Sequence, residues 1–488
     1  PGKSLQLDVT YSGSVTLSAR RLLTIGTPED MALHTDWDEI SVPFTGLRGF
    51  GNVVWYPVSS VPVILGDGDR LFSEIGRHKL RLTGAHFRLR LTVEFPSGQQ
   101  PTIALVNGHP VNLSVINASV MEPGVPGIAT ASVDHVTLGF ETPSVFVAIR
   151  RAHAGTHLTA WTLPDNEVAV QAWTAASGTV APFIEDWLGQ HPRSELTLLD
   201  LPDPDDAPYE TGALLAASLA EKPADQLDRA LVHALAHAFT QPAATEPPPA
   251  WLSEGIATFI DTLWTERRQG REQALDMLEA DRSALALAEP SSPGESPGEP
   301  LATAISPVYY RTKAAYIFWM LRDLAGDAAL SDVLRAYSSK PIADADPVSA
   351  VTGNSLEKLL RKDGVSRDLS WFFADWVDTD EGLPDLTIKN VFPNAEQGGT
   401  VLVAVNVANA GYASAEVPVT VRTRDSAVTE RLLVPARGTA VQRILVMGKP
   451  TSVQVNDGTV PETQASVHVT HLDGPAADPA SSSSSSPQ

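Results

Sequence analysis

Residues 231–239, with the sequence LVHALAHAF, decide how the centre of this 488-residue chain folds. Apolar residues recur at helical spacing over 224–239, which predicts an amphipathic helix. His233 and His237 are four residues apart, so this helix places both imidazoles on one face, one turn from each other. Two imidazoles in that arrangement can bind the same metal ion.

The spacing of the two histidines is a weak signal by itself, because histidine pairs on helices more often pack in a core or lie on a surface. His153 and His157 have the same spacing, but they follow the β-like run 144–149 and enclose a glycine. A strand does not place residues i and i+4 one helical turn apart. We therefore expect His153 and His157 to lie in a strand or loop, without a metal ion.

A carboxylate follows the pair His233 and His237 closely. Glu254 lies in the sequence WLSEGIA, and the sixteen residues that separate it from His237 include four prolines. These prolines break the chain, so Glu254 should begin a second helix that packs against the first. His233, His237 and Glu254 would then supply the three protein ligands of a catalytic Zn²⁺ ion and leave a fourth position for water.

Taken together, these motifs resemble those of the gluzincin metallopeptidases of the aminopeptidase N type. The resemblance covers about residues 180–385 and includes the run 308–322 and the sequence DLSWFFADWV at 368–377. It implies a thermolysin-like catalytic domain that hydrolyses peptide or protein substrates with the help of zinc. It also implies an acidic residue near the site, at Asp261.

The chain departs from the family pattern at two catalytic positions. The general-base Glu that stands between the two histidines in the family is replaced here by Ala234. The position of the family's transition-state tyrosine is Arg311, so the resemblance assigns that role to the adjacent Tyr310, with Tyr309 as the second candidate. Ordinary packing at the start of a helix is an equal alternative for both tyrosines.

A third departure concerns substrate binding. The family's amine-binding motif aligns with residues 212–216, which makes Gly212 and Ala213 candidate substrate-binding residues and places Leu215 where the family has a Glu. An apolar side chain cannot pair with an ammonium group, so the active form is expected to cleave internal bonds rather than act as an aminopeptidase. Glu210 is an alternative carboxylate for the ammonium group.

Ala234 has no titratable group, and the protein as given is therefore expected to be inactive or nearly so. The rest of the site is present, which favours an engineered Glu to Ala change over a natural loss. A natural pseudopeptidase that binds peptides or proteins is the alternative. A structural surface protein whose histidines never bind a metal ion is a further one.

The composition limits the partners and the location. The net charge is −23 with only 35 Lys and Arg residues, which argues against nucleic acid and anionic membranes as partners. No apolar run approaches the ~20 residues that cross a bilayer. The alanine- and proline-rich sequence indicates a bacterial protein, and it begins at Pro1 without a signal peptide. We expect a secreted or periplasmic protein that acts on extracellular, including glycosylated, substrates.

The expected fold is multidomain α+β. The predicted parts are an N-terminal β domain at 1–175, the mainly helical catalytic domain at 176–383, an immunoglobulin-like sandwich of seven strands at 384–472, and a disordered tail at 473–488. Predicted strands lie at 5–9, 86–93, 145–149 and 168–173, and an edge-like strand at 195–200. Further helices are predicted near 307–325, 329–338, 355–363 and 367–378. The aromatic run 49–58 is expected in a β-core, with a substrate groove as the less favoured alternative.

Overall fold

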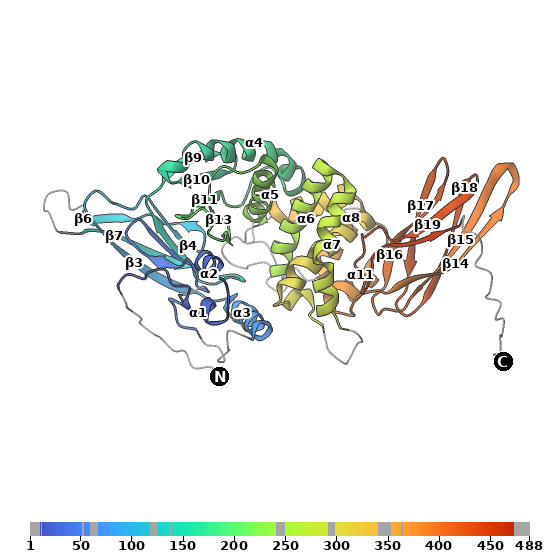
Figure 1. Ribbon diagram of the computed structural model, residues 1–488, viewed down its shortest axis with the longest axis horizontal. Coiled ribbons are helices and arrows are strands. Elements are labelled where there is room, and N and C mark those ends of the chain that lie inside the picture. Colours follow the sequence, from blue (N-terminus) through green and yellow to red (C-terminus); the bar gives the residue numbers. More distant parts are fainter. Residues whose placement is uncertain are drawn as a thin grey trace, which may run out of the picture. The chain divides into compact units, whose positions relative to one another are not determined.

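The computed structural model of the chain is a mixed α+β structure (Figure 1). The structure describes residues 10, 12–50, 53–58, 67–117, 125–135, 138–240, 249–290, 298–339, 353–362 and 365–472. The chain divides into two compact units, Pro1–Arg271 with Leu301–Arg367, and Glu272–Pro300 with Asp368–Gln488. The predicted α+β class is confirmed, whereas the predicted strand at 5–9 and the predicted tail at 473–488 lie outside the described residues. No helix among the described residues is long and apolar enough to span a membrane.

Two antiparallel sheets form the N-terminal part of the first unit. The first has the order β1-β2-β8-β4-β5, and its strands are β1 (Glu39–Ile40), β2 (Phe44–Leu47), β8 (Val145–Ala148), β4 (Ile103–Val106) and β5 (His109–Pro110). The second has the order β3-β7-β6, with β3 (Phe87–Phe95), β7 (Gly127–His135) and β6 (Ser114–Asn117). The predicted strands at 86–93 and 145–149 are confirmed as β3 and β8.

Strands β4 and β8 are buried on both faces, which explains why every residue in them is apolar and buried. On one face, Ala104 and Val147 pack against the sheet of β3. On the other face, Leu105 and Phe146 share a core cluster with Leu214 of a third sheet. The N-terminal sheets and the third sheet therefore share one continuous core.

The third sheet is five-stranded, with the order β12-β13-β11-β10-β9. Its strands are β12 (Tyr209–Thr211), β13 (Leu214–Ala217), β11 (Leu196–Asp200), β10 (Leu158–Thr162) and β9 (Arg151–Gly155). The strand predicted at 195–200 is present as β11, but it is central in the sheet rather than at the edge. The edge position belongs to β12, which runs antiparallel to β13 and pairs Glu210 with Leu215.

The predicted strand at 168–173 is wrong, because these residues begin helix α4 (Ala169–Leu188). The apolar residues of this segment, among them Val170, Trp173 and Ile184, are buried at intervals of three and four, which is the helical pattern. The period-two alternation that suggested a strand includes Val168, which is exposed in the structure. Residue 175, the expected domain boundary, lies inside α4.

Helices complete the first unit. They are α1 (Arg20–Thr24), α2 (Glu29–Thr35), α3 (Gly68–Leu82), α5 (Ala224–Thr240), α6 (Ala250–Gln269), α8 (Ala314–Ala325), α9 (Asp327–Ser339), α10 (Gly353–Lys362), the π-helix η3 (Val308–Lys313) and the 3₁₀ turns η1 (Pro164–Asn166) and η2 (Leu301–Thr303). The helices predicted near 307–325, 329–338 and 355–363 are confirmed. A Cβ atom on Gly255 would lie 2.6 Å from Cβ of Ala314, so this glycine allows α6 and α8 to pack closely.

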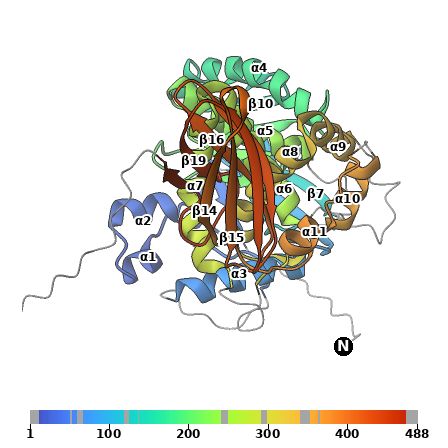
Figure 2. The ribbon, with the colours of Figure 1, turned by 90° about the vertical axis from the view of Figure 1, so that its right-hand side faces the viewer.

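The second unit contains α7 (Arg271–Ala288), the short helices α11 (Ser370–Phe373) and η5 (Ala374–Asp378), the 3₁₀ turn η6 (Gln397–Gly399) and seven strands. The strands are β14 (Leu386–Ala395), β15 (Thr400–Asn409), β16 (Ala415–Thr423), β17 (Ala427–Val434), β18 (Thr439–Met447), β19 (Pro450–Val455) and β20 (His468–His471). They form the sheets β14-β15-β18 and β17-β16-β19-β20, whose strands run alongside one another in Figure 2. The seven predicted strands and the predicted helix near 367–378 are confirmed.

Candidate metal centre

The two histidines of the LVHALAHAF sequence lie on one face of α5, as predicted. Their ring centroids are 4.9 Å apart and the rings are inclined by 76°. His237 is buried, and its Nδ1 lies 3.1 Å from the hydroxyl oxygen of Ser253, at the start of α6. When Nδ1 carries the proton, it donates a hydrogen bond to the hydroxyl oxygen of Ser253, and Nε2 keeps a lone pair for a metal ion.

Two carboxylates approach the histidines from different elements. Glu254, on α6, places Oε1 3.9 Å from Nε2 of His237. Glu210, on the edge strand β12, places Oε2 3.4 Å from Nε2 of His233. The candidate ligand atoms of Glu210, His233 and His237 all lie within 4.8 Å of one another. Glu254 is not part of that set. The structure thus brings Glu254 near His237 but places Glu210, which the sequence indicated only as a candidate for the ammonium group, within ligand distance of both histidines.

The protonation states of these groups suit a zinc ion. Burial, together with the charge of His237, lowers the pKa of His233 to about 3, so this imidazole is neutral at physiological pH. Burial alone would raise the pKa of Glu254, but the charges of His237, Arg311 and His233 lower it to about 2, so the carboxylate is ionised. Neutral imidazole and carboxylate are the donor set of catalytic zinc sites, and the cluster therefore fits that ion.

Ala234 is buried between the two histidines on α5, with 2% of its surface exposed. Its methyl group neither binds a metal ion nor exchanges a proton. The position that carries the general base in the family pattern is thus inside the protein next to the cluster, and in this chain it is chemically inert.

Arg311, in η3, contacts the cluster. Its guanidinium donates two hydrogen bonds to Oε2 of Glu254, from Nε at 3.0 Å and from Nη2 at 2.8 Å. The ring of Tyr310 packs edge-on against that of Phe140, with the ring centroids 5.3 Å apart. Burial and the charge of Glu254 raise the pKa of Tyr310 to about 12, so its hydroxyl stays protonated and able to donate. Tyr309 is buried, with Nζ of Lys313 5.6 Å from its ring centroid.

The predicted substrate-binding residues Gly212 and Ala213 lie directly after the edge strand. Gly212 has a φ of 58°, and its N–H donates to Oε1 of Glu141 at 2.8 Å, while the hydroxyl of Thr211 donates to the other oxygen. Ala213 is buried, and so is Leu215 on β13. Glu210, not Leu215, is therefore the side chain from this region that reaches the histidines.

Asp261 lies on α6, two helical turns after Glu254, and it binds Arg229 of α5 through two hydrogen bonds of 3.1 and 3.0 Å. Burial raises the pKa of Asp261, and the Arg229 guanidinium opposes that shift. The ion pair connects the two helices that carry the predicted ligands. It holds their spacing rather than adding a ligand.

The second histidine pair is separate from this site, as predicted. His153 lies on β9, and His157 follows in a turn with a φ of 60°. Nε2 of His157 is 2.7 Å from a carboxylate oxygen of Glu185 on α4. This contact connects the turn after β9 to helix α4.

Two residues that sequence reasoning missed, Glu141 and Lys79, border the cluster from the N-terminal part of the chain. Glu141 accepts the bonds from Thr211 and Gly212, and its burial raises its pKa. Lys79, on α3, is close enough for the charge of Glu254 to act on it. Neither residue belongs to a recognisable motif, and both are far in sequence from the helices with the histidines.

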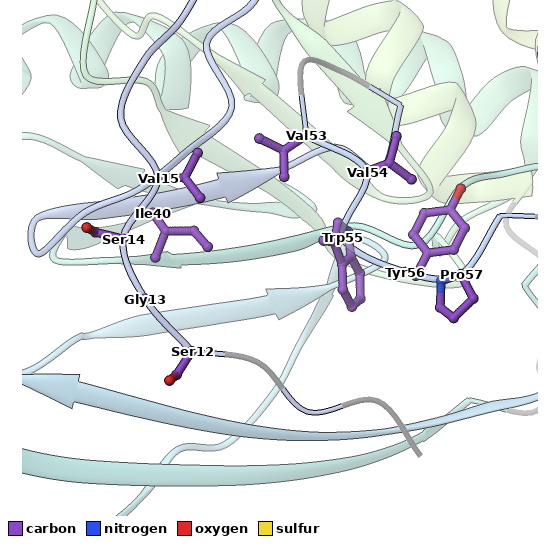
Figure 3. A pocket seen from close by; sticks show the side chains of 10 residues that line it. All are labelled: Ser12, Gly13, Ser14, Val15, Ile40, Val53, Val54, Trp55, Tyr56 and Pro57. Atoms are coloured by element: carbon purple, nitrogen blue, oxygen red, sulfur yellow. The ribbon is translucent and has the colours of Figure 1, made fainter. Parts of the chain in front are cut away.

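A cavity of about 470 Å³ lies elsewhere in the first unit (Figure 3). It is lined by residues 12–15, Ile40 and 53–57, part of the aromatic run 49–58. Trp55 in its wall also packs against the core beside β4 and β8, so this run contributes both to a core and to a cavity. The lining contains no histidine or carboxylate, and we therefore place the chemistry at the histidine cluster.

No family model matches the chain, and no curated protein is significantly similar to it. A functional assignment therefore depends on the geometry of the cluster and on the motifs that build it.

Proposed function

We propose that the chain is a zinc metallopeptidase of the gluzincin type in which Ala234 has removed the general base. The observation that carries the proposal is that His233 and His237 of α5 face two carboxylates, Glu254 of the adjoining helix α6 and Glu210 of β12. Pro249 is the N-cap residue of α6, and the sequence WLSEG follows within that helix. Zinc binding, hydrolytic activity and an extracytoplasmic location all belong to this proposal.

Each residue of the cluster has a separate role in the proposed hydrolysis. His233, His237 and Glu254 hold the metal ion, which polarises water and the carbonyl group of the substrate when it is bound. Tyr310, protonated and next to Arg311, donates a hydrogen bond to the oxygen on which charge develops. A Glu at position 234 would accept the proton from the attacking water. Alanine cannot, and loss of a general base costs about 10²–10⁴ in rate.

The edge strand β12 supports a peptide as the substrate. An extended peptide can add to an open sheet edge through its main-chain groups. Such a peptide would pass Glu210 and reach the histidines, since Glu210 lies in β12 and its Oε2 is 3.4 Å from His233. This geometry fits a segment of an unfolded or flexible protein chain.

The role of Glu210 distinguishes an enzyme that cleaves internal peptide bonds from one that removes N-terminal residues. Leu215 is buried in β13, so it does not line the site where a substrate amine would bind. We retain internal cleavage as our proposal on a different basis: Oε2 of Glu210 lies 3.4 Å from Nε2 of His233 and within 4.8 Å of both histidine donors, so this carboxylate is engaged at the cluster and is not free to bind an ammonium group. An aminopeptidase would instead use Glu210 to hold the substrate amine.

A peptide-binding protein without activity is the second candidate. Two observations favour it: Ala234 at the base position, and Arg311, which occupies the family's tyrosine position and engages Glu254. In such a protein, the histidine cluster would hold zinc and a bound peptide without hydrolysis.

One comparison tests the proposal. Protein purified without added metal is analysed for zinc, and Ala234→Glu and Ala234→Gln are assayed on an unstructured protein substrate with and without chelator. We expect about one zinc ion per chain in all three forms and chelator-sensitive cleavage only in Ala234→Glu. Absence of zinc uptake would refute the metal site. Zinc without activity in Ala234→Glu would refute the peptidase and favour the peptide-binding protein.

A further inference from the structure

Lys79 and Arg311 are two cations that lie beside the histidine cluster from different elements, α3 and η3. Lys79 lies on α3, half-buried, with Nζ 5.6 Å from the ring centroid of Phe140. Among the described residues, no ion pair joins this ammonium group to a carboxylate, although the charges of Glu254 and Glu141 act on its pKa. The second cation is Arg311, whose side chain is half exposed.

A continuous set of contacts connects the two cations. The ammonium group of Lys79 lies over the ring of Phe140. The ring of Tyr310, the neighbour of Arg311, packs edge-on against Phe140, with ring centroids 5.3 Å apart. A Cβ atom on Gly76 of α3 would lie 2.2 Å from the carbonyl oxygen of Ile305, so this glycine lets α3 pack on the segment that leads into η3. These contacts hold α3 against the segment that leads into η3, and the charge of Arg311 contributes to lowering the pKa of Lys79.

The carboxylates near these cations already have other partners. Oε2 of Glu254 accepts both bonds from Arg311, and its Oε1 faces His237. Glu141 accepts from Thr211 and Gly212. Arg311 binds Glu254 through Nε and Nη2 only, so within the described part of the chain Nη1 is left for another acceptor. An acidic ligand is the chemistry that would satisfy Nη1 and the ammonium group of Lys79 together.

We propose that Lys79 and Arg311 form a subsite for a substrate carboxylate beside the metal cluster. The substrate class is then peptides with an acidic side chain or a free C-terminal carboxylate near the bond at the metal. This selectivity would arise in the site itself, because the chain carries a net charge of −23 and its surface repels anionic peptides in general. The inference depends on the proposed function, since it concerns the same site.

The test uses the zinc-supplemented protein as given, in which Ala234 preserves the ligand. Three fluorescein-labelled hexapeptides of otherwise identical sequence serve as probes: one with a central Glu and an amidated C-terminus, one with Gln and an amidated C-terminus, and one with Gln and a free C-terminal carboxylate. We expect at least one of the two acidic peptides to bind roughly tenfold more tightly than the Gln amide, with a difference that shrinks at high salt. Which of them does so identifies the source of the carboxylate.

Lys79→Met should abolish this preference, and Lys79→Arg should retain it. Lys222→Met is the matched control, because Lys222 is also half-buried and lies over an aromatic ring, with Nζ 5.5 Å from the ring centroid of Trp173. Arg311 is left unchanged, since it also holds Glu254. The zinc content of Lys79→Met reports whether the surrounding fold is intact.

The outcomes separate the two proposals. Equal affinities for the three peptides, with zinc bound, would overturn the carboxylate subsite and leave the peptidase proposal standing. A preference that survives Lys79→Met with zinc bound would also overturn it. Absence of both zinc uptake and peptide binding would overturn the proposed function and the subsite together.

Discussion

Arg311 holds one oxygen of Glu254 with two N–H groups, at 3.0 and 2.8 Å, while the other oxygen faces His237 at 3.9 Å. The arginine therefore fixes which oxygen of the carboxylate is presented to the histidines. A residue that orients a metal ligand in this way affects the affinity for the metal without touching it. Arg311 thus has a structural role at the cluster.

This relationship predicts that Arg311→Ala weakens zinc binding by about 10- to 100-fold, because Glu254 loses the group that orients it. Competition with a chromophoric chelator measures the affinity. Arg322→Ala is the control, since Arg322 pairs with Glu266 and Asp327 away from the cluster. An affinity that is the same for Arg311→Ala and the parent protein would show that Glu254 is oriented by other contacts.

The role of Glu210 predicts a second result. If Glu210 belongs to the metal ligands, Glu210→Gln weakens zinc binding, and peptides with free and with acetylated N-termini bind the zinc-loaded protein equally well. Both quantities are measurable on the protein as given, by chelator competition and by calorimetry. A strong preference for peptides with a free N-terminus, lost in Glu210→Gln while the zinc affinity is unchanged, would instead indicate that Glu210 binds the substrate amine, as in an aminopeptidase.

Glu141 predicts an effect on stability at the edge strand. Glu141→Ala leaves the N–H of Gly212 and the hydroxyl of Thr211 without their acceptor, which should cost about 1–3 kcal/mol in the free energy of unfolding. Urea unfolding gives that value, and hydrogen exchange should show faster exchange in β12 and β13. Glu141→Gln retains an acceptor oxygen and should lower the free energy of unfolding by less than Glu141→Ala does. Unchanged exchange in both variants would mean that β12 is held by other bonds.

The second unit should be sensitive to pH through His468. Its Nε2 lies 2.9 Å from an oxygen of the buried Glu462, which also accepts from the N–H of Leu386 and from Asn456. Hydrogen bonding to Glu462 raises the pKa of His468 above its ordinary value of 6.5, although burial opposes this, and the charges of Glu462 and Asp385 add to the rise.

Because the pKa is higher in the folded state, the pair stabilises the fold fully below about pH 6.5, and that contribution is lost as the pH rises through the folded pKa. We therefore expect His468→Gln to lower the thermal unfolding midpoint more at pH 6 than at pH 8. Scans of both proteins at the two pH values give this difference. A difference that is independent of pH would contradict the assignment.

Local patterns in the sequence predicted the helical part of the site. The histidine spacing and the WLSEG sequence lie within single helices, so their geometry follows from the helical period and the break at the prolines. The strand predicted at 168–173 failed because three apolar residues at alternate positions fit the start of α4 equally well. A short run contains too few turns to distinguish the two periods.

The remaining site residues depend on tertiary contacts that no local pattern encodes. Glu141 meets Thr211 and Gly212 across about seventy positions of chain, and Lys79 comes from a still earlier helix. The motif comparison pointed to Leu215, but strand pairing sets Glu210 opposite it and turns Glu210 toward the histidines. Register between strands is decided by the whole sheet.

The strands β4 and β8, buried on both faces, have a practical consequence. A fragment that begins near residue 176 would contain both histidines and Glu254, and by the sequence alone it looks like a self-sufficient catalytic domain. It would lack β9 and β10 and would expose Leu199 and Leu214, which are packed against Leu105 and Phe146 in the intact chain. Such a fragment should aggregate instead of folding. Because these strands join the sheets of the first unit, we expect that unit to unfold in one thermal step, which calorimetry can check.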